Sequence, residues 1–283
     1  MRAYLYIVAA TQDPNRVTCP VPYKIEDQPE IFFGPCKKRL RQDLRREFLA
    51  DNKACKPTED IYLIGFNGAN AQRCRKIVWA GKVERLMTFA EADRSLTAAK
   101  YQKFRNWPET PLHLRRRTDG RSGYEHVGTL HSGDWLADIV SSAKPAHVNS
   151  TEAGLTVDSC TSWPLDRDLC MLLSNICFAG DGFPGIDIND ELLAILISAQ
   201  SDRCVDKYSV FGKRKNGTAD GRTGSWLSLV GSDAEQFVDC LKGEVQARSR
   251  ALGNERRSEE IVANATPRGA DGQSEVAKPR GRC

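Results

Sequence analysis

The sequence lacks any run of about 18 apolar residues, the length that a helix needs to cross a bilayer. Its first segment, MRAYLYIVAA, is short for a signal peptide and has no small-residue cleavage site, so we expect it to form the first strand, over Tyr4–Ala10. Together these two absences predict a cytoplasmic protein that does not associate with a membrane.

A metal-binding cysteine pair is also absent. The chain has ten cysteines, but none of them forms a C-x2-C pair, the spacing that lets two thiolates reach one ion. The densest group, Cys160, Cys170 and Cys177, lies in or near an apolar run, where buried free thiols are common. We therefore expect reduced thiols, no metal and no cofactor.

Aromatic residues are absent after Phe237, and polar segments of mixed charge follow it. Such a segment has too little apolar surface to offset the entropy lost on ordering. We expect a single α+β domain over residues 1–242, and a frayed helix with a disordered tail over residues 243–283.

Charge is distributed unevenly along the chain. Residues 1–121 contain 24 Lys and Arg against 14 Asp and Glu, whereas residues 122–242 contain 9 against 17. Because Lys and Arg contacts to phosphates dominate nucleic-acid affinity, this pattern is typical of a phosphate-binding front half. The alternative is that the two halves attract each other within one fold.

Residues 60–93 read as strand, basic loop, strand and helix, with Arg73 and Arg75 in the loop. Thr88 and Glu91 have the spacing of a helix capping box. Trp79 lies in the second strand, where alternation places it on the face of Ile77. It is therefore either a core residue or an aromatic wall for a flat ligand, because its neighbours on both faces are apolar.

The segment 36–48, CKKRLRQDLRREF, predicts an amphipathic helix with an apolar stripe of Leu40, Leu44 and Phe48. Its other face is predicted to be basic and either simply solvated or in contact with phosphate. The cations of this face are Lys37, Lys38, Arg39, Arg41, Arg45 and Arg46.

A second basic segment follows the helix expected over Leu96–Trp107. It contains Arg115, Arg116 and Arg117, and guanidinium groups both pair with phosphates and stack on bases. The sequence therefore predicts either a nucleic-acid contact or an unstructured basic loop at this position.

Three further residues are candidate acid/base or metal groups, namely His126, His131 and Asp134. The five-residue step between the two histidines does not place both rings on one face of a helix or of a strand. The alternative is that His131 and Asp134 are polar ends of a turn before a helix over Trp135–Val140.

Gly180, Gly182 and Gly185 match the G-x-G-x-x-G pattern of dinucleotide folds. Pro184 lies inside the match and no βαβ unit precedes it, so we expect a strand, a turn and a helix over Asn189–Ala199 without a nucleotide. Val210–Leu229 is expected to form a hairpin-like segment with a basic tip.

Several segments carry a family resemblance: RAYLYIVA, GPCKKRLR, DIYLIGFNG followed by RKIVWAGKVERLMTFAEA, and LLSNICFAGDGFPGI. Over residues 1–190 they resemble the bacterial and phage group called nucleotide modification associated domain 2. That group is linked to systems that make or handle modified DNA bases, and its element order is similar to PUA-like folds such as EVE and YTH. Those folds hold a flipped base in an aromatic pocket. Within the matched pattern lie Trp79 and the basic segment 37–39.

We therefore expect an α+β domain whose curved, mixed, partly barrel-like sheet has helices packed on it. The expected function is binding of DNA or RNA, or of a modified base, in a DNA-modification or phage-defence setting. The expected contacts are Lys37, Lys38, Arg39, Arg41, Arg73, Arg75, Trp79, Arg115, Arg116 and Arg117. The alternative is an enzyme acting on a nucleotide or DNA base with His126, His131 and Asp134.

Overall fold

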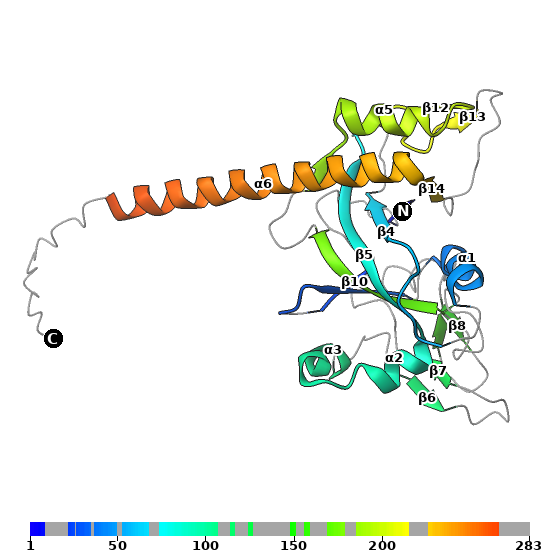
Figure 1. Cartoon of the computed structure of the whole chain (residues 1–283). Helices are drawn as coiled ribbons and strands as arrows, with labels where there is room; N and C mark the ends of the chain where they lie inside the picture. Colours follow the sequence, from blue (N-terminus) through cyan, green and yellow to red (C-terminus); the bar gives the residue numbers. More distant parts are fainter. Residues whose placement is uncertain are drawn as a thin grey trace, which may run out of the picture. The chain divides into compact units, whose positions relative to one another are not determined.

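A computed structural model shows a mixed α+β architecture (Figure 1). The structure describes residues 1–8, 22–25, 27–34, 37–49, 53–67, 74–106, 169–178, 185–214 and 226–265. It also describes the backbone of four short strands, at 114–116, 124–126, 148–150 and 156–158. Side chains of residues 38, 213, 214 and 255–265 are not among those described.

One large sheet contains most of the longer strands. Its members are β1 (Arg2–Ile7), β2 (Tyr23–Lys24), β3 (Glu30–Phe33), β4 (Ile61–Phe66), β5 (Lys76–Thr88), β10 (Leu169–Phe178), β11 (Ile186–Asp187) and β14 (Trp226–Val230). The order is β14-β1-β4-β5-β10-β3-β2, with β11 beside β5. The β1–β4 pair is parallel, and the other pairs are antiparallel. Among the described residues β14 and β2 are open edges, so the sheet is not a closed barrel.

Helices and two-stranded ladders complete the fold. The helices are α1 (Lys38–Phe48), α2 (Phe89–Ser95), the short 3₁₀ helix η1 (Ala99–Tyr101), α3 (Gln102–Asn106), α5 (Asp190–Ser198) and α6 (Gly231–Ala265). The ladders pair β6 (Leu114–Arg116) with β7 (Tyr124–His126), β8 (Val148–Ser150) with β9 (Thr156–Asp158), and β12 (Arg203–Cys204) with β13 (Lys213–Arg214).

The sheet curls strongly, as a contact between two distant strands demonstrates. Tyr6 on β1 and Phe33 on β3 are separated by four steps in the strand order, which in a flat sheet is about 19 Å. Their ring centroids are nevertheless 5.8 Å apart. Irregularities in the pairing of β5 with β4 and β10 accompany the curl, because β-bulges bend strands. The strands β5 and β10 are visibly curved in Figure 1.

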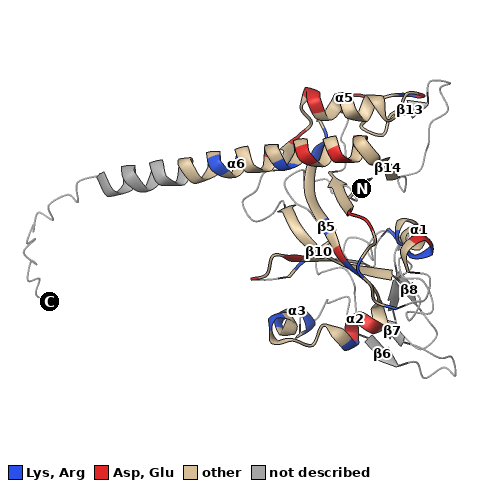
Figure 2. Ribbon diagram, in the orientation of Figure 1, with Lys and Arg blue, Asp and Glu red and all other residues tan. Residues whose placement is uncertain are grey.

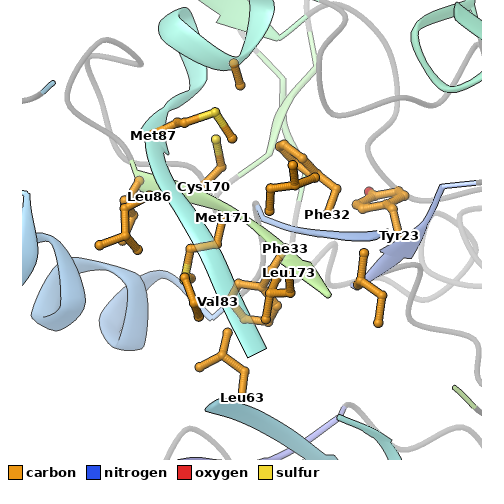
Figure 3. Packing of buried hydrophobic residues seen from close by; sticks show 14 of the residues in the cluster. Tyr23, Phe32, Phe33, Leu63, Val83, Leu86, Met87, Cys170, Met171 and Leu173 are labelled. Atoms are coloured by element: carbon orange, nitrogen blue, oxygen red, sulfur yellow. The ribbon is translucent and has the colours of Figure 1, made fainter. Parts of the chain in front are cut away.

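The concave face of the curled sheet encloses the main hydrophobic core (Figure 3). β1 and β4 contribute alternate residues to it, as the two-residue period of a strand requires, whereas β3 and β10 contribute consecutive residues. The buried residues contributed by the central strands include Tyr4, Tyr6, Leu63, Trp79, Val83, Met171 and Leu173. Leu40 and Leu44 of α1 belong to the same core, so α1 packs its apolar stripe there as its sequence predicts.

The opposite face of the sheet is covered by other elements. Tyr62 and Phe66 on β4 share this face, since they lie four residues apart on one strand. The Lys242 ammonium lies 5.2 Å from the centre of the Tyr62 ring, and the Phe66 ring is 5.8 Å from that of Phe211. The first turns of α6 and the segment after α5 therefore shield this side of β4.

Two helix starts have the caps that the sequence predicts or permits. The backbone N–H of Glu91 donates to Thr88 Oγ1 at 3.1 Å, and the N–H of Thr88 donates back to the Glu91 carboxylate at 3.3 Å. The predicted capping box is thus confirmed. Asn189 caps α5 by accepting from the Leu192 N–H at 2.8 Å. Both helices start where a local side chain satisfies a free backbone donor.

Two expectations about local structure are wrong. The described ends of Val210–Leu229 do not pair with each other as in a hairpin, because β13 pairs with β12 and β14 pairs with β1. The helix expected over Leu96–Trp107 is shorter, consisting of η1 and α3, and Leu96 ends α2. The partner of β14 is β1, which lies more than two hundred residues earlier in the sequence. After Leu96 the chain turns earlier than the spacing of apolar residues suggests.

The chain divides into two units, Met1–Gly243 and Glu244–Cys283, and α6 runs through the boundary between them. The buried residues of α6, Ala234, Phe237, Val238 and Leu241, all precede the boundary. Within the described ranges, every helix is too short or too polar to span a lipid bilayer.

Candidate nucleic-acid interface

The first turn of α1 is unusually basic for a helix start. Lys37 precedes it with φ 59° and ψ 44°, and no side chain caps the helix. The Lys37 ammonium lies 5.3 Å from the centre of the Tyr6 ring. Arg39 is exposed, whereas the side chain of Lys38 is outside the described residues. Positive charges near a helix start oppose the helix dipole, so an anion placed there would be stabilised.

Arg41 does not belong to this surface, which corrects the expectation that it contacts phosphate. Its side chain is 0% exposed, and its Nη1 donates to the carbonyl of Leu169 at 2.7 Å. The guanidinium also lies 5.7 Å from the centre of the Phe89 ring. The physical reason is helical phase: Arg41 precedes Leu44 by three residues and Phe48 by seven, so it lies on the apolar stripe.

Trp79 lies in the core, which decides between the two interpretations of this residue. It is 1% exposed, and its ring is 5.8 Å from those of both Tyr6 and Phe33. The expectation of a solvent-facing aromatic wall is therefore wrong for the structure as it stands. Its indole Nε1 is buried and has no hydrogen-bond acceptor among the described residues.

Arg75 lies at the loop end of the β4–β5 hairpin, directly before β5. Its Nη1 donates to the carbonyl of Asn67 at 2.5 Å, and the guanidinium is half-buried. Burial lowers the pKa of this guanidinium from its ordinary value, and no carboxylate among the described residues opposes the effect. A half-buried cation without a counter-ion is costly, because desolvation disfavours the charged form.

The acidic groups near Arg75 are engaged by other cations. Lys76 pairs with Asp187 at 3.2 Å, and Lys207 pairs with Asp190 at 2.9 Å. The backbone N–H of Arg75 donates to the carbonyl of Lys207 at 2.8 Å, so these pairs lie close to it. In the part of the chain that the structure describes, the loop end of this hairpin therefore has one cation in excess.

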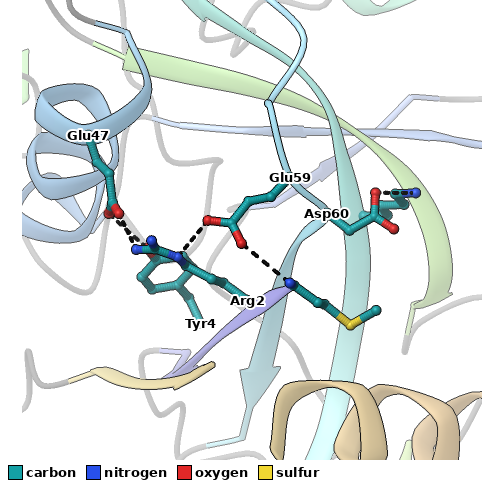
Figure 4. A network of polar contacts seen from close by, with 7 residues as sticks. Arg2, Tyr4, Glu47, Glu59 and Asp60 are labelled. Carbon is teal, nitrogen blue, oxygen red and sulfur yellow. Dashed lines mark hydrogen bonds and ion pairs between the residues drawn. The ribbon is translucent and has the colours of Figure 1, made fainter. Parts of the chain in front are cut away.

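Most described ion pairs of the front half are formed within that half. They include Lys82–Asp60, Lys100–Glu30, Lys103–Asp27 and Arg105–Asp93. Arg2 lies between Glu47 of α1 and Glu59, which also accepts from the chain's amino group (Figure 4). Lys76–Asp187 does join the two halves. Among the described residues, the acids of the second half thus do not account for most of the pairing of the basic half.

Several cations of the front half have no carboxylate partner among the described residues. Lys53 and Lys56 are exposed and flank Cys55, whose backbone pairs with Leu86 at the end of β5. Arg39 on α1 and Arg94 on α2 are also exposed. Figure 2 shows in blue that both helices carry Lys or Arg. Lys53 and Lys56 were not predicted as site residues, because their segment has no periodicity and its pairing with β5 is long-range.

The remaining predicted residues fall largely outside the described structure. Arg115 and Arg116 lie on β6, where they pair with Glu125 and Tyr124 of β7, and His126 ends β7 opposite Leu114. Their side chains are not described. Arg73, Arg117, His131 and Asp134, and the helix expected over Trp135–Val140, lie outside the described residues. The enzymatic alternative therefore stays a prediction.

No three His, Cys, Asp or Glu side chains among the described residues gather in a way that could hold a metal ion. The described cysteines are not joined in disulfides, and burial raises the pKa of Cys177 to about 12. Buried neutral thiols of this kind act as small apolar side chains rather than as nucleophiles.

Comparison of the chain with protein-family models, with curated proteins and with solved structures finds no match.

Proposed function

We propose that the protein binds nucleic acid through the cations of its first 121 residues. The observation that supports this most directly is the excess of cations over carboxylate partners in this half of the chain. Lys53, Lys56, Arg39 and Arg94 are exposed without such a partner among the described residues, and Arg75 is half-buried without one. Unpaired cations on several elements suit an extended polyanion better than a small acidic ligand.

The finer proposal is that the sheet is PUA-like in its curvature. The contact between Tyr6 and Phe33 supports it, since the strands that carry them approach across the concave face. A role with modified bases in DNA modification or phage defence is proposed from the family resemblance alone. Because Trp79 is buried, the proposal assigns affinity to phosphate contacts and not to stacking on that ring.

The test is a salt series of binding to short fluorescent single-stranded DNA, duplex DNA and RNA. Replacing Lys53 and Lys56 by Gln removes two unpaired cations, so the slope of log affinity against log salt should become shallower by about one to two units. The matched control replaces Lys82 and Lys103 by Gln, because both are paired with carboxylates and the charge lost is the same.

An equal decrease in affinity and in salt slope for both double variants would show that only net charge matters, and that Lys53 and Lys56 do not contact the nucleic acid. Absence of any binding by the unaltered protein at low salt would remove the proposal altogether. The charge asymmetry would then reflect electrostatics within the fold.

A further inference from the structure

The hairpin between β4 and β5 holds one arginine in a fixed position. Nη1 of Arg75 donates to the carbonyl of Asn67. Asn67 is itself held by two hydrogen bonds, one through its backbone N–H and one through its side chain. Its N–H donates to the carbonyl of Lys76 at 3.0 Å, and its Oδ1 accepts from the N–H of Lys76 at 2.9 Å. These bonds hold the carbonyl that the guanidinium contacts, and so they help to position Nη1 of Arg75.

The other edge of this guanidinium has no acceptor. Nε of Arg75 is buried without a hydrogen-bond partner, and among the described residues no acceptor faces Nη2. Buried donors are nearly always satisfied in folded proteins, so an unsatisfied one requires an explanation. The Nε–Nη2 edge presents two parallel N–H groups, the geometry that matches two oxygens of a phosphate or carboxylate.

The carboxylates that the structure describes do not supply those oxygens. Asp187 and Asp190 pair with Lys76 and Lys207, and these two lysines are the chain neighbour of Arg75 and the acceptor of its backbone N–H. No acceptor for this edge is found among the described residues, and an anion bound there would both accept these N–H groups and offset the excess positive charge.

We propose that Arg75 binds one phosphate group through its Nε–Nη2 edge and that, resting on the proposed function, this phosphate belongs to the nucleic-acid backbone. The contact positions the nucleic acid against the β4–β5 hairpin. It carries no sequence information, because phosphate oxygens are the same at every nucleotide. Arg75 is therefore expected to strengthen binding by the same amount for every nucleotide sequence.

The test compares Arg75→Gln and Arg75→Lys with the unaltered protein in binding of a short fluorescent single-stranded DNA. Arg75→Gln should weaken binding about tenfold, as expected for a lost charge-assisted pair, and should make the salt slope shallower by about 0.7. Arg75→Lys should keep the slope while still losing affinity, because an ammonium retains the charge without the two-pronged edge. Lys103→Gln, an exposed and paired lysine, is the matched control and should change neither.

A second arm distinguishes the source of the phosphate, with inorganic phosphate and a nucleoside monophosphate as probes in thermal unfolding. If these small ions stabilise the unaltered protein but not Arg75→Gln, and DNA affinity is the same in both, the site binds free phosphate and the assignment to the nucleic-acid backbone is overturned.

If DNA binds strongly and Arg75→Gln and Arg75→Lys both leave its affinity unchanged, the inference fails while the proposed function stands. If DNA does not bind at all, both fail. Arg75→Lys keeps the cation, so it gives a result even if Arg75→Gln is unstable.

Discussion

Gly65 on β4 lies directly against the indole of Trp79 on β5, with no space for a side chain between them. A Cβ at position 65 would overlap with Nε1 and Cδ1 of Trp79 and would lie 2.8 Å from the side chain of Val8. The glycine is therefore what allows the largest side chain of the core to lie flat against the sheet.

Replacing Gly65 by Ala should destabilise the protein by about 1–3 kcal/mol, since overpacking forces neighbouring side chains or the backbone to shift. In a Trp79→Leu background the same change should cost less, because the atoms that it meets are gone. Urea unfolding of the two single variants and the double variant measures this coupling. Strictly additive losses would show that Gly65 and Trp79 are not in contact.

Arg41 and Arg39 lie two residues apart on α1 but have opposite environments, so their variants should behave oppositely. Arg41→Ala should lower stability by about 2–3 kcal/mol, because it removes a charged hydrogen bond to Leu169 and leaves a cavity. Arg39→Ala should leave stability unchanged, because the side chain is exposed, and should weaken nucleic-acid binding.

Thermal unfolding and anisotropy titrations on both variants check this pair. A stable Arg41→Ala protein with weakened binding would place Arg41 on the surface and refute its burial.

In α1, the sequence alone predicts which leucines are buried but not the burial of Arg41. The stripe of Leu40 and Leu44 was predictable from helical spacing, and so was the capping box of Thr88 and Glu91, because both depend on residues within one or two turns. The charge of Arg41 suggests the solvated face of the helix, whereas its position relative to Leu44 and Phe48 places it on the buried one.

Contacts between residues far apart in the chain could not be predicted from the sequence pattern. Trp79 could not be assigned to a face because apolar residues occupy both sides of its strand. The pairing of β14 with β1 joins residues more than two hundred positions apart, and no local signal specifies it. The sequence does not indicate that Arg75 lacks a carboxylate partner among the described residues, because this depends on Asp187 and Asp190 pairing with lysines in the folded structure.

Stability should fall with rising pH through the titration of Cys177. Burial raises its pKa from 9.0 to about 12, so the neutral thiol is favoured in the folded state. The stabilisation is complete below the pKa of the unfolded chain and is lost as pH rises from 9.0 toward about 12. Urea unfolding of Cys177→Ala should show a weaker loss over this range than the unaltered protein. Identical pH profiles would mean that the thiol is accessible to solvent in the folded state.

Removing residues 244–283 should change the melting temperature by less than about 3 °C, equivalent to roughly 1 kcal/mol. The buried residues of α6 lie at or before Leu241 and are retained. Differential scanning calorimetry of the truncated and complete chains measures the shift. A fall of many degrees would show that the second unit stabilises the first.

The central claim, that an unneutralised cation excess serves nucleic-acid binding, is tested most directly by the affinity of the complete chain for short single-stranded DNA across a salt series. The claim predicts binding at low salt that weakens linearly on a log–log plot, with a slope of several units because each phosphate contact contributes about 0.7. Binding that is undetectable at low salt, or that is independent of salt, would contradict it.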